Sequence, residues 1–226
     1  MNFPSLQVLN FLDNPDDIVD YANTLSYEKD NYSAGKRTSP LYEFDKTIFN
    51  NVNYRIMRLL YPDAITWDKI TWNAMTYFHK IKYEDVDLII NNEKNPCKGW
   101  IHQDNFCKFT SITYLSKGKD NGTAIYSPKN VFDLKKDEDI KYDHYRGKEV
   151  DKEQFSKELN RNLDKYNVEC MFGSSYNKMI GFDGSSHHGA LYTMKPGEER
   201  LTLISFIKSI NAPYFPMAEM RRISEL

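Results

Sequence analysis

The chain has 226 residues, of which 30 are Lys or Arg and 32 are Asp or Glu, so its formal net charge is −2. Apolar residues make up 40% of the chain and aromatic residues 14%, which excludes a wholly disordered protein, a collagen-like repeat and a disulfide scaffold. The near-neutral charge gives no global positive field, so nucleic-acid binding has no electrostatic support. The length fits a single domain.

Two helices are predicted within residues 1–64. The first begins at Asn14-Pro15, where the asparagine is a cap candidate and the proline takes the first helical position. The second begins near Asp45, carries an apolar stripe at helical spacing and ends before Pro62. We expect both helices to form a flank that supports a sheet.

From residue 65 onward the sequence favours strands, because short segments rich in β-branched and aromatic residues alternate with turn formers. The predicted strands span 71–78, 109–115, 168–172, 178–182 and 200–207. A charged insertion at about 129–166 interrupts them, and one amphipathic helix is predicted there from Phe155, Leu159, Leu163 and Tyr166. Helices first and strands later predict a mainly β, α+β fold: one domain, 1–226, with its core at 65–210.

The three cysteines, Cys97, Cys107 and Cys170, have neither the number nor the spacing of a disulfide framework or a zinc finger. The N-terminus lacks a signal-peptide pattern, and no stretch reaches 18 consecutive apolar residues. We therefore expect a cytoplasmic protein with no membrane partner.

Candidate metal ligands lie in two separate segments. His102 and Asp104 are two residues apart, so on a strand they would share a face. A third ligand is available in the Gly/Ser-rich stretch around His187 and His188, which is predicted to be a loop at the end of a strand. Two histidines and one carboxylate suit non-haem Fe(II) chemistry. Each feature alone has a structural explanation, because His102 and Asp104 could form a cap or a surface ion pair and the His pair could lie in a polar loop.

A candidate anion-binding residue follows at the start of the last strand. Arg200 shares a strand face with Thr202, and its planar guanidinium matches a carboxylate in bidentate geometry. The alternative is an exposed arginine that pairs with Glu198 or Glu199.

The order His-x-Asp, distant His, Arg-x-Thr resembles the Fe(II)- and 2-oxoglutarate-dependent dioxygenases, particularly the prolyl-4-hydroxylase-like branch, over residues 65 to 210. The resemblance implies a double-stranded β-helix of the jelly-roll or cupin kind. It also implies Fe(II) held by His102, Asp104 and His188, with 2-oxoglutarate bound through Arg200. Thr202 and Tyr114 would share the carboxylate of 2-oxoglutarate. His188 is favoured over His187 because it precedes the small Gly189.

The implied reaction is hydroxylation of a substrate C–H bond by O2, with release of succinate and CO2. The resemblance leaves the substrate open between a small molecule and a protein, and the insertion at 129–166 could cover it. A basic patch of Lys135, Lys136, Lys141 and Arg146 could attract a polyanion. The rival interpretations are a cupin-type Zn²⁺ or Mn²⁺ hydrolase or isomerase that uses the same ligands, and a noncatalytic binding module.

Overall fold

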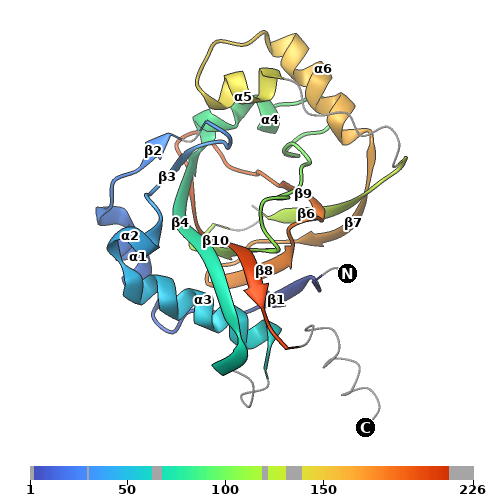
Figure 1. Ribbon diagram of the computed structural model, residues 1–226. Coiled ribbons are helices and arrows are strands. Elements are labelled where there is room, and N and C mark those ends of the chain that lie inside the picture. The colour runs from blue at the N-terminus through green and yellow to red at the C-terminus, as the bar shows by residue number, and fades with distance from the viewer. Residues whose placement is uncertain (1–2, 30, 63–67, 119–121, 131–138, 214–226) are drawn as a thin grey trace.

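The computed structural model describes residues 3–29, 31–62, 68–118, 122–130 and 139–213. Two antiparallel sheets face each other, one with the strand order β1-β8-β5-β10-β4-β3-β2 and one with the order β7-β6-β9 (Figure 1). This is a double-stranded β-helix, as predicted. The strands of the large sheet are β1 (Leu6–Val8), β2 (Glu28–Lys29), β3 (Lys36–Arg37), β4 (Thr71–Lys82), β5 (Phe109–Tyr114), β8 (Lys178–Asp183) and β10 (Glu199–Asn211). Those of the small sheet are β6 (Thr123–Pro128), β7 (Tyr166–Phe172) and β9 (His187–Ala190).

Helices cover the outer face of the large sheet and one end of the molecule (Figure 1). They are α1 (Pro15–Thr24), α2 (Leu41–Phe44), α3 (Lys46–Leu60), α4 (Asp87–Ile90), α5 (Asp139–Tyr145) and α6 (Lys152–Leu163), with a short 3-10 turn at Tyr83–Asp85. Both predicted N-terminal helices are confirmed as α1 and α3. Asp45 caps α3 by accepting a hydrogen bond from the Ile48 backbone. Asn14 occupies the N-cap position of α1, as predicted, but its side chain makes no capping hydrogen bond.

The core lies between the large sheet and α3. Ile56 and Met57 of α3 pack against a layer that includes Phe78 of β4 and Leu203 of β10, all of them buried. Because side chains alternate along a strand, the neighbouring residues of β4 and β10 face the other way, toward the small sheet. One face of the large sheet therefore stabilises the fold, and the other is available for a site.

The strand register sets a row of side chains on that inner face. Thr202 of β10 is the direct partner of both His79 of β4 and Tyr114 of β5, and Arg37 of β3 is the partner of His79. Directly opposed residues of an antiparallel pair lie on the same face. Tyr114, Thr202, His79 and Arg37 thus form one row across four neighbouring strands.

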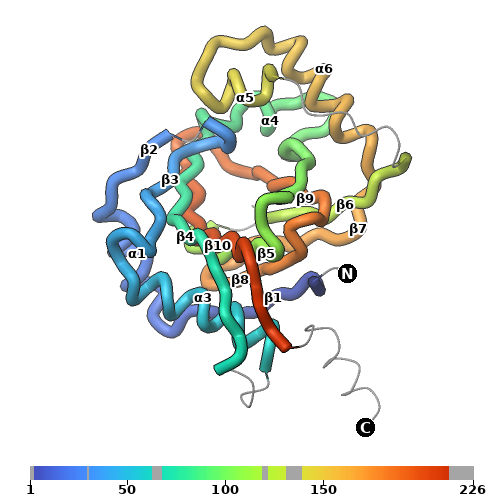
Figure 2. The backbone as a smooth tube through the Cα atoms, in the orientation of Figure 1, coloured from blue at the N-terminus to red at the C-terminus, as the bar shows by residue number. Residues whose placement is uncertain are grey.

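The predicted insertion contains two helices, α5 and α6, between β6 and β7, and Figure 2 shows both helices at the end of the molecule away from α3. The predicted helix is confirmed as α6, but Tyr166 begins β7 instead of extending it. The second helix, α5, was not predicted. Lys141 of α5 is buried, so it cannot belong to an exposed basic patch, and Lys135 and Lys136 lie outside the described residues.

The described cysteines are free thiols. Among the described residues, no helix combines the length and apolar character that a membrane span requires.

Candidate metal centre and its cavity

A pair of backbone hydrogen bonds joins the two segments that carry the candidate ligands. The His102 amide donates to the His188 carbonyl at 2.9 Å, and the His188 amide donates to the His102 carbonyl at 2.9 Å. The segment around His102 is otherwise irregular, so the strand expected there is wrong, and His187–Ala190, expected as a loop, is strand β9. This isolated bridge brings the two imidazole rings to a centroid separation of 4.4 Å.

Three side chains from these segments converge on one point. Within the part of the chain that the structure describes, His102, Asp104 and His188 each offer a ligand atom, and these atoms lie within 4.8 Å of one another. The His188 Nε2 atom is 3.4 Å from Asp104 Oδ2, and the His102 Nε2 atom is 3.9 Å from Asp104 Oδ1. The separations are those of atoms that could share one cation.

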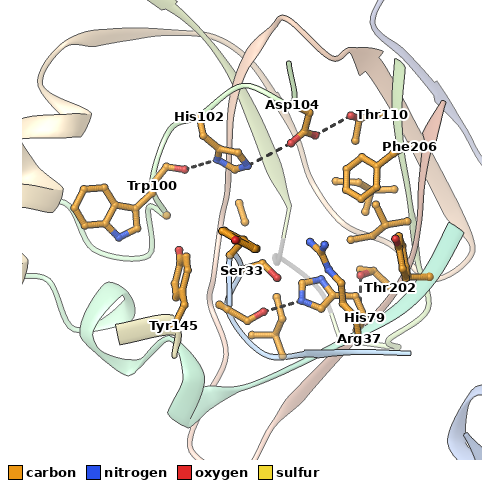
Figure 3. Close-up of a pocket in the computed structure, with 18 of the residues that line it drawn as sticks. Ser33, Arg37, His79, Trp100, His102, Asp104, Thr110, Tyr145, Thr202 and Phe206 are labelled. Atoms are coloured by element: carbon orange, nitrogen blue, oxygen red, sulfur yellow. Dashed lines mark hydrogen bonds and ion pairs between the residues drawn. The ribbon is translucent and has the colours of Figure 1, made fainter. Parts of the chain in front are cut away.

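Backbone carbonyls fix the orientation of both rings. His102 Nδ1 lies 3.0 Å from the Trp100 carbonyl oxygen, and His188 Nδ1 lies 2.9 Å from that of Ser186. A carbonyl oxygen only accepts, so each Nδ1 carries a proton and each Nε2 is the ring atom turned toward Asp104. The Thr110 hydroxyl donates to Asp104 Oδ2 at 2.8 Å (Figure 3). Such outer contacts orient metal ligands.

The electrostatics of His102 and Asp104 suit a cation. Burial in the cavity wall, reinforced by His188 and Lys141, lowers the pKa of His102 to about 3, although 42% of its side chain faces the cavity. Burial alone would raise the pKa of Asp104, but the facing His188 and His102 rings and the Thr110 hydroxyl outweigh it, and the pKa lies below its usual value. His102 is therefore neutral and Asp104 charged at pH 7, the forms that bind a metal.

His187 takes a different direction from His188. Its ring lies against Tyr166, with a centroid separation of 5.0 Å, because successive side chains of β9 point to opposite faces. The structure thus brings His188, and not His187, to His102 and Asp104.

The three ligands open into a cavity of about 780 Å³ that Arg200 and Thr202 also line. Arg200 is only 5% exposed, and its Nε and Nη1 atoms are buried without a hydrogen-bond partner in the described part of the chain. Its guanidinium lies over the rings of Tyr114 and Tyr192, at 5.3 and 5.8 Å from their centroids. Tyr114 itself is outside the cavity lining, and its hydroxyl is 2.9 Å from that of Thr123. Tyr114 therefore supports the guanidinium from behind.

Sequence reasoning missed several residues of this cavity. Arg37, Tyr192 and His79 line it, and so does Lys141, which the sequence had placed only in a basic patch. The His79 Nε2 atom is 2.7 Å from the Ala34 carbonyl, so that atom is a donor and not a metal ligand. A signal for His79 was present, since Tyr77 and His79 alternate with core residues on β4. The sequence contained no such signal for Arg37, because β3 has only two residues and shows no alternating pattern.

Comparison with solved structures shows what this fold is similar to. HygX from Streptomyces hygroscopicus, solved with nickel and 2-oxoglutarate bound, aligns with a TM-score of 0.53 and 10% identity over 93% of this chain and 84% of its own. The carbocyclase SnoK from nogalamycin biosynthesis, described as non-heme and alpha ketoglutarate dependent, aligns with a TM-score of 0.50 and 8% identity over 98% and 86%. A Pseudomonas putida prolyl-4-hydroxylase aligns at 0.47 with 10% identity over 90% and 91%.

No protein-family model matches the sequence, and neither does any curated protein. At these identities the structural likeness establishes the fold, and the prolyl-4-hydroxylase-like branch stays a prediction.

Proposed function

We propose that this chain, which has the fold of the 2-oxoglutarate- and Fe(II)-dependent oxygenases, is such an oxygenase and hydroxylates a substrate in the cavity beside His102, Asp104 and His188. The observation that carries the proposal is the pairing, in one cavity, of a three-ligand cluster with a buried guanidinium that lacks partners. The guanidinium does not stabilise the fold in an obvious way, since two of its buried nitrogen atoms have no hydrogen-bond partner.

The donor set fits Fe(II). Two neutral imidazoles and one carboxylate on one side of a metal leave its remaining positions open, which is the arrangement of the non-haem Fe(II) oxygenases. His102, Asp104 and His188 would hold the ion. The Nδ1 hydrogen bonds and Thr110 would keep the three ligands aimed at it.

The unpartnered atoms of Arg200 fit the far carboxylate of 2-oxoglutarate. A buried guanidinium without partners is costly, and a bidentate carboxylate supplies two acceptors in matching geometry. Thr202 lines the cavity beside Arg200 on the same strand face, and its hydroxyl, which donates to the His79 carbonyl at 3.5 Å, would turn to the same carboxylate. The Tyr114 and Tyr192 rings hold the guanidinium in place by cation–π contact.

When bound, Fe(II) and 2-oxoglutarate supply oxygen activation coupled to decarboxylation to succinate. The chain's own residues position these groups and exclude water from them. The buried Phe182 ring packs on His188 at a centroid separation of 4.5 Å, so the metal side of the cavity is walled by apolar surface. Each Nδ1 keeps its proton in a hydrogen bond to the backbone carbonyl, which leaves each Nε2 as the ring atom available to the metal.

The test is to load the protein with Fe(II) and 2-oxoglutarate without oxygen, then admit oxygen and measure succinate and oxygen uptake. We expect uncoupled succinate formation in the wild-type protein and none in His102→Ala or His188→Ala. Arg200→Gln should mainly raise the 2-oxoglutarate concentration required. His187→Ala is the matched control, because it removes a neighbouring imidazole that points away, and it should retain turnover.

The rival interpretations give different results in this experiment. A protein that retains Zn²⁺ or Mn²⁺ and forms no succinate would be the hydrolase or isomerase. A protein that binds neither a metal nor 2-oxoglutarate would be the noncatalytic module. Full succinate formation in His102→Ala would remove the assigned metal centre.

A further inference from the structure

The cavity has more positive charge than the proposed cosubstrate uses. Its basic lining residues are Lys29, Arg37, Lys141 and Arg200, and its acidic ones are Glu28 and Asp104. A divalent metal and the 2-oxoglutarate dianion cancel each other, so an excess of two positive charges remains among the described lining residues. Positive charge in a walled cavity favours an anionic guest.

Arg37 is the basic residue best placed to use that excess. It comes from β3, next to β4, and is the register partner of His79 on the inner face of the sheet. In Figure 3 its guanidinium end points into the middle of the cavity, on the side of His79 toward His102 and Asp104. Both Arg37 and Arg200 act electrostatically on His79, so the two guanidiniums lie near the same imidazole.

The surroundings of Arg37 combine charge with apolar surface. Its Cζ atom lies over the rings of Tyr77 and Phe206, at 5.8 and 5.7 Å from their centroids. A guanidinium held beside aromatic rings by cation–π attraction has five N–H donors in a fixed fork that matches an acid group. Tyr77, Ile204 and Phe206 line the cavity beside it and offer an apolar wall.

We propose that Arg37 binds an acid group of the substrate, a carboxylate or a phosphate, and that the substrate is a small molecule whose apolar part packs on Tyr77, Ile204 and Phe206. This inference rests on the proposed function. A cavity of about 780 Å³ lies within the range that takes a drug-sized ligand. Arg200 then binds the carboxylate of 2-oxoglutarate, and Arg37 binds the acid group of the substrate. The two ligands are distinguished because each acid group reaches a different guanidinium.

The test uses binding, so it does not depend on turnover. The protein is loaded with Mn²⁺, and 2-oxoglutarate is titrated by calorimetry. With 2-oxoglutarate saturating, 3-phenylpropionate, phenyl phosphate and the neutral 3-phenylpropan-1-ol are titrated in turn. Whichever of the two acids has the higher affinity should bind at least about 10-fold more tightly than the alcohol, since a hydrogen bond to a charged group contributes that much. The two acids distinguish a carboxylate from a phosphate.

Arg37→Gln should remove the preference for the acid, a loss of about 10- to 100-fold, and leave the affinity for 2-oxoglutarate unchanged. That unchanged affinity also shows that the variant is folded. Arg37→Lys, which keeps the charge without the planar fork, should retain part of the preference. Lys36→Gln is the matched control, because it removes a positive charge from the same strand at an exposed position.

Two results would overturn the assignment: no preference for either acid in the wild-type protein, or a preference that survives Arg37→Gln. Loss of 2-oxoglutarate binding in Arg37→Gln but not in Arg200→Gln would also overturn it, because Arg37 would then be the cosubstrate anchor. Failure of the proposed function is a separate result, seen as no 2-oxoglutarate binding in the wild-type protein.

Discussion

Arg200 should destabilise the ligand-free protein and stabilise the loaded one. Its Nε and Nη1 atoms are buried without partners, and each unmade hydrogen bond costs about 1–3 kcal/mol. Cation–π contacts with the rings of Tyr114 and Tyr192 stabilise the guanidinium by about 1–2 kcal/mol together, which offsets part of that cost. Arg200→Met keeps the length of the side chain and removes the charge, so we expect the ligand-free variant to be more stable by about 1–4 kcal/mol.

Differential scanning calorimetry measures this effect. In a chain of this size each kcal/mol shifts the melting temperature by about 2–4 °C, so the metal-free variant should melt visibly above the wild-type protein. Adding Mn²⁺ with 2-oxoglutarate at 100 times its dissociation constant should stabilise the wild-type protein by about 2.7 kcal/mol and the variant far less. The difference between the melting temperatures of the variant and the wild-type protein should therefore become smaller or change sign.

Lys208→Met is the control, because Lys208 is an exposed cation on the same strand. It should not change the response to 2-oxoglutarate. If Arg200→Met melts below the wild-type protein in the absence of ligands, the guanidinium is satisfied within the folded chain and the reasoning about its unmet donors is wrong.

Three further predictions concern the same region. Thr110→Val removes the donor to Asp104 with little change of shape and should weaken Mn²⁺ binding by about 10-fold or more in calorimetry; unchanged affinity would mean that the carboxylate needs no such support. Burial and then Arg37 hold the pKa of His79 well below 6.5, so unfolding takes up a proton at that residue below about pH 6.5. Stability to urea should fall from pH 7 to pH 5, and His79→Gln should reduce the fall; an equal fall in both proteins would contradict this. A methyl group at Gly184 would meet backbone oxygens at 2.4 and 2.9 Å, so Gly184→Ala should lower both stability and Mn²⁺ affinity, whereas Gly118→Ala, with nothing within 4 Å, should change neither.

The regular elements could be predicted because their side chains repeat. The apolar stripe of α3 and the β-branched run of β10 each predict the type of element and its buried face, without knowledge of what the element packs against. The fold class followed from their order along the chain. The extra helix α5 was missed because its seven residues give too short a pattern, and two of them, Lys141 and Tyr145, are buried for reasons that lie in the cavity.

The candidate site was only partly predictable. Residue types and their order pointed to His102, Asp104, His188 and Arg200, but the local structure around the ligands was wrong. What joins the two ligand segments is an isolated backbone bridge between residues distant in sequence, and periodicity carries no information about such a contact. The close approach also needs residues without a side chain, since a Cβ at Gly184 would collide with the Asp104 and Cys107 carbonyls.

The N-terminal flank does more than support the sheet, which is what its helices alone had indicated. Because β3 pairs with the far edge of β4, the strand order extends the inner face by one more position and places Arg37 in line with His79 and Thr202. The helices that follow β3 pack on the opposite face of the same sheet. One chain segment thus stabilises the outer face and completes the inner one. Substitutions at neighbouring positions of β4 should separate the two effects, with Phe78 affecting stability and His79 the cavity.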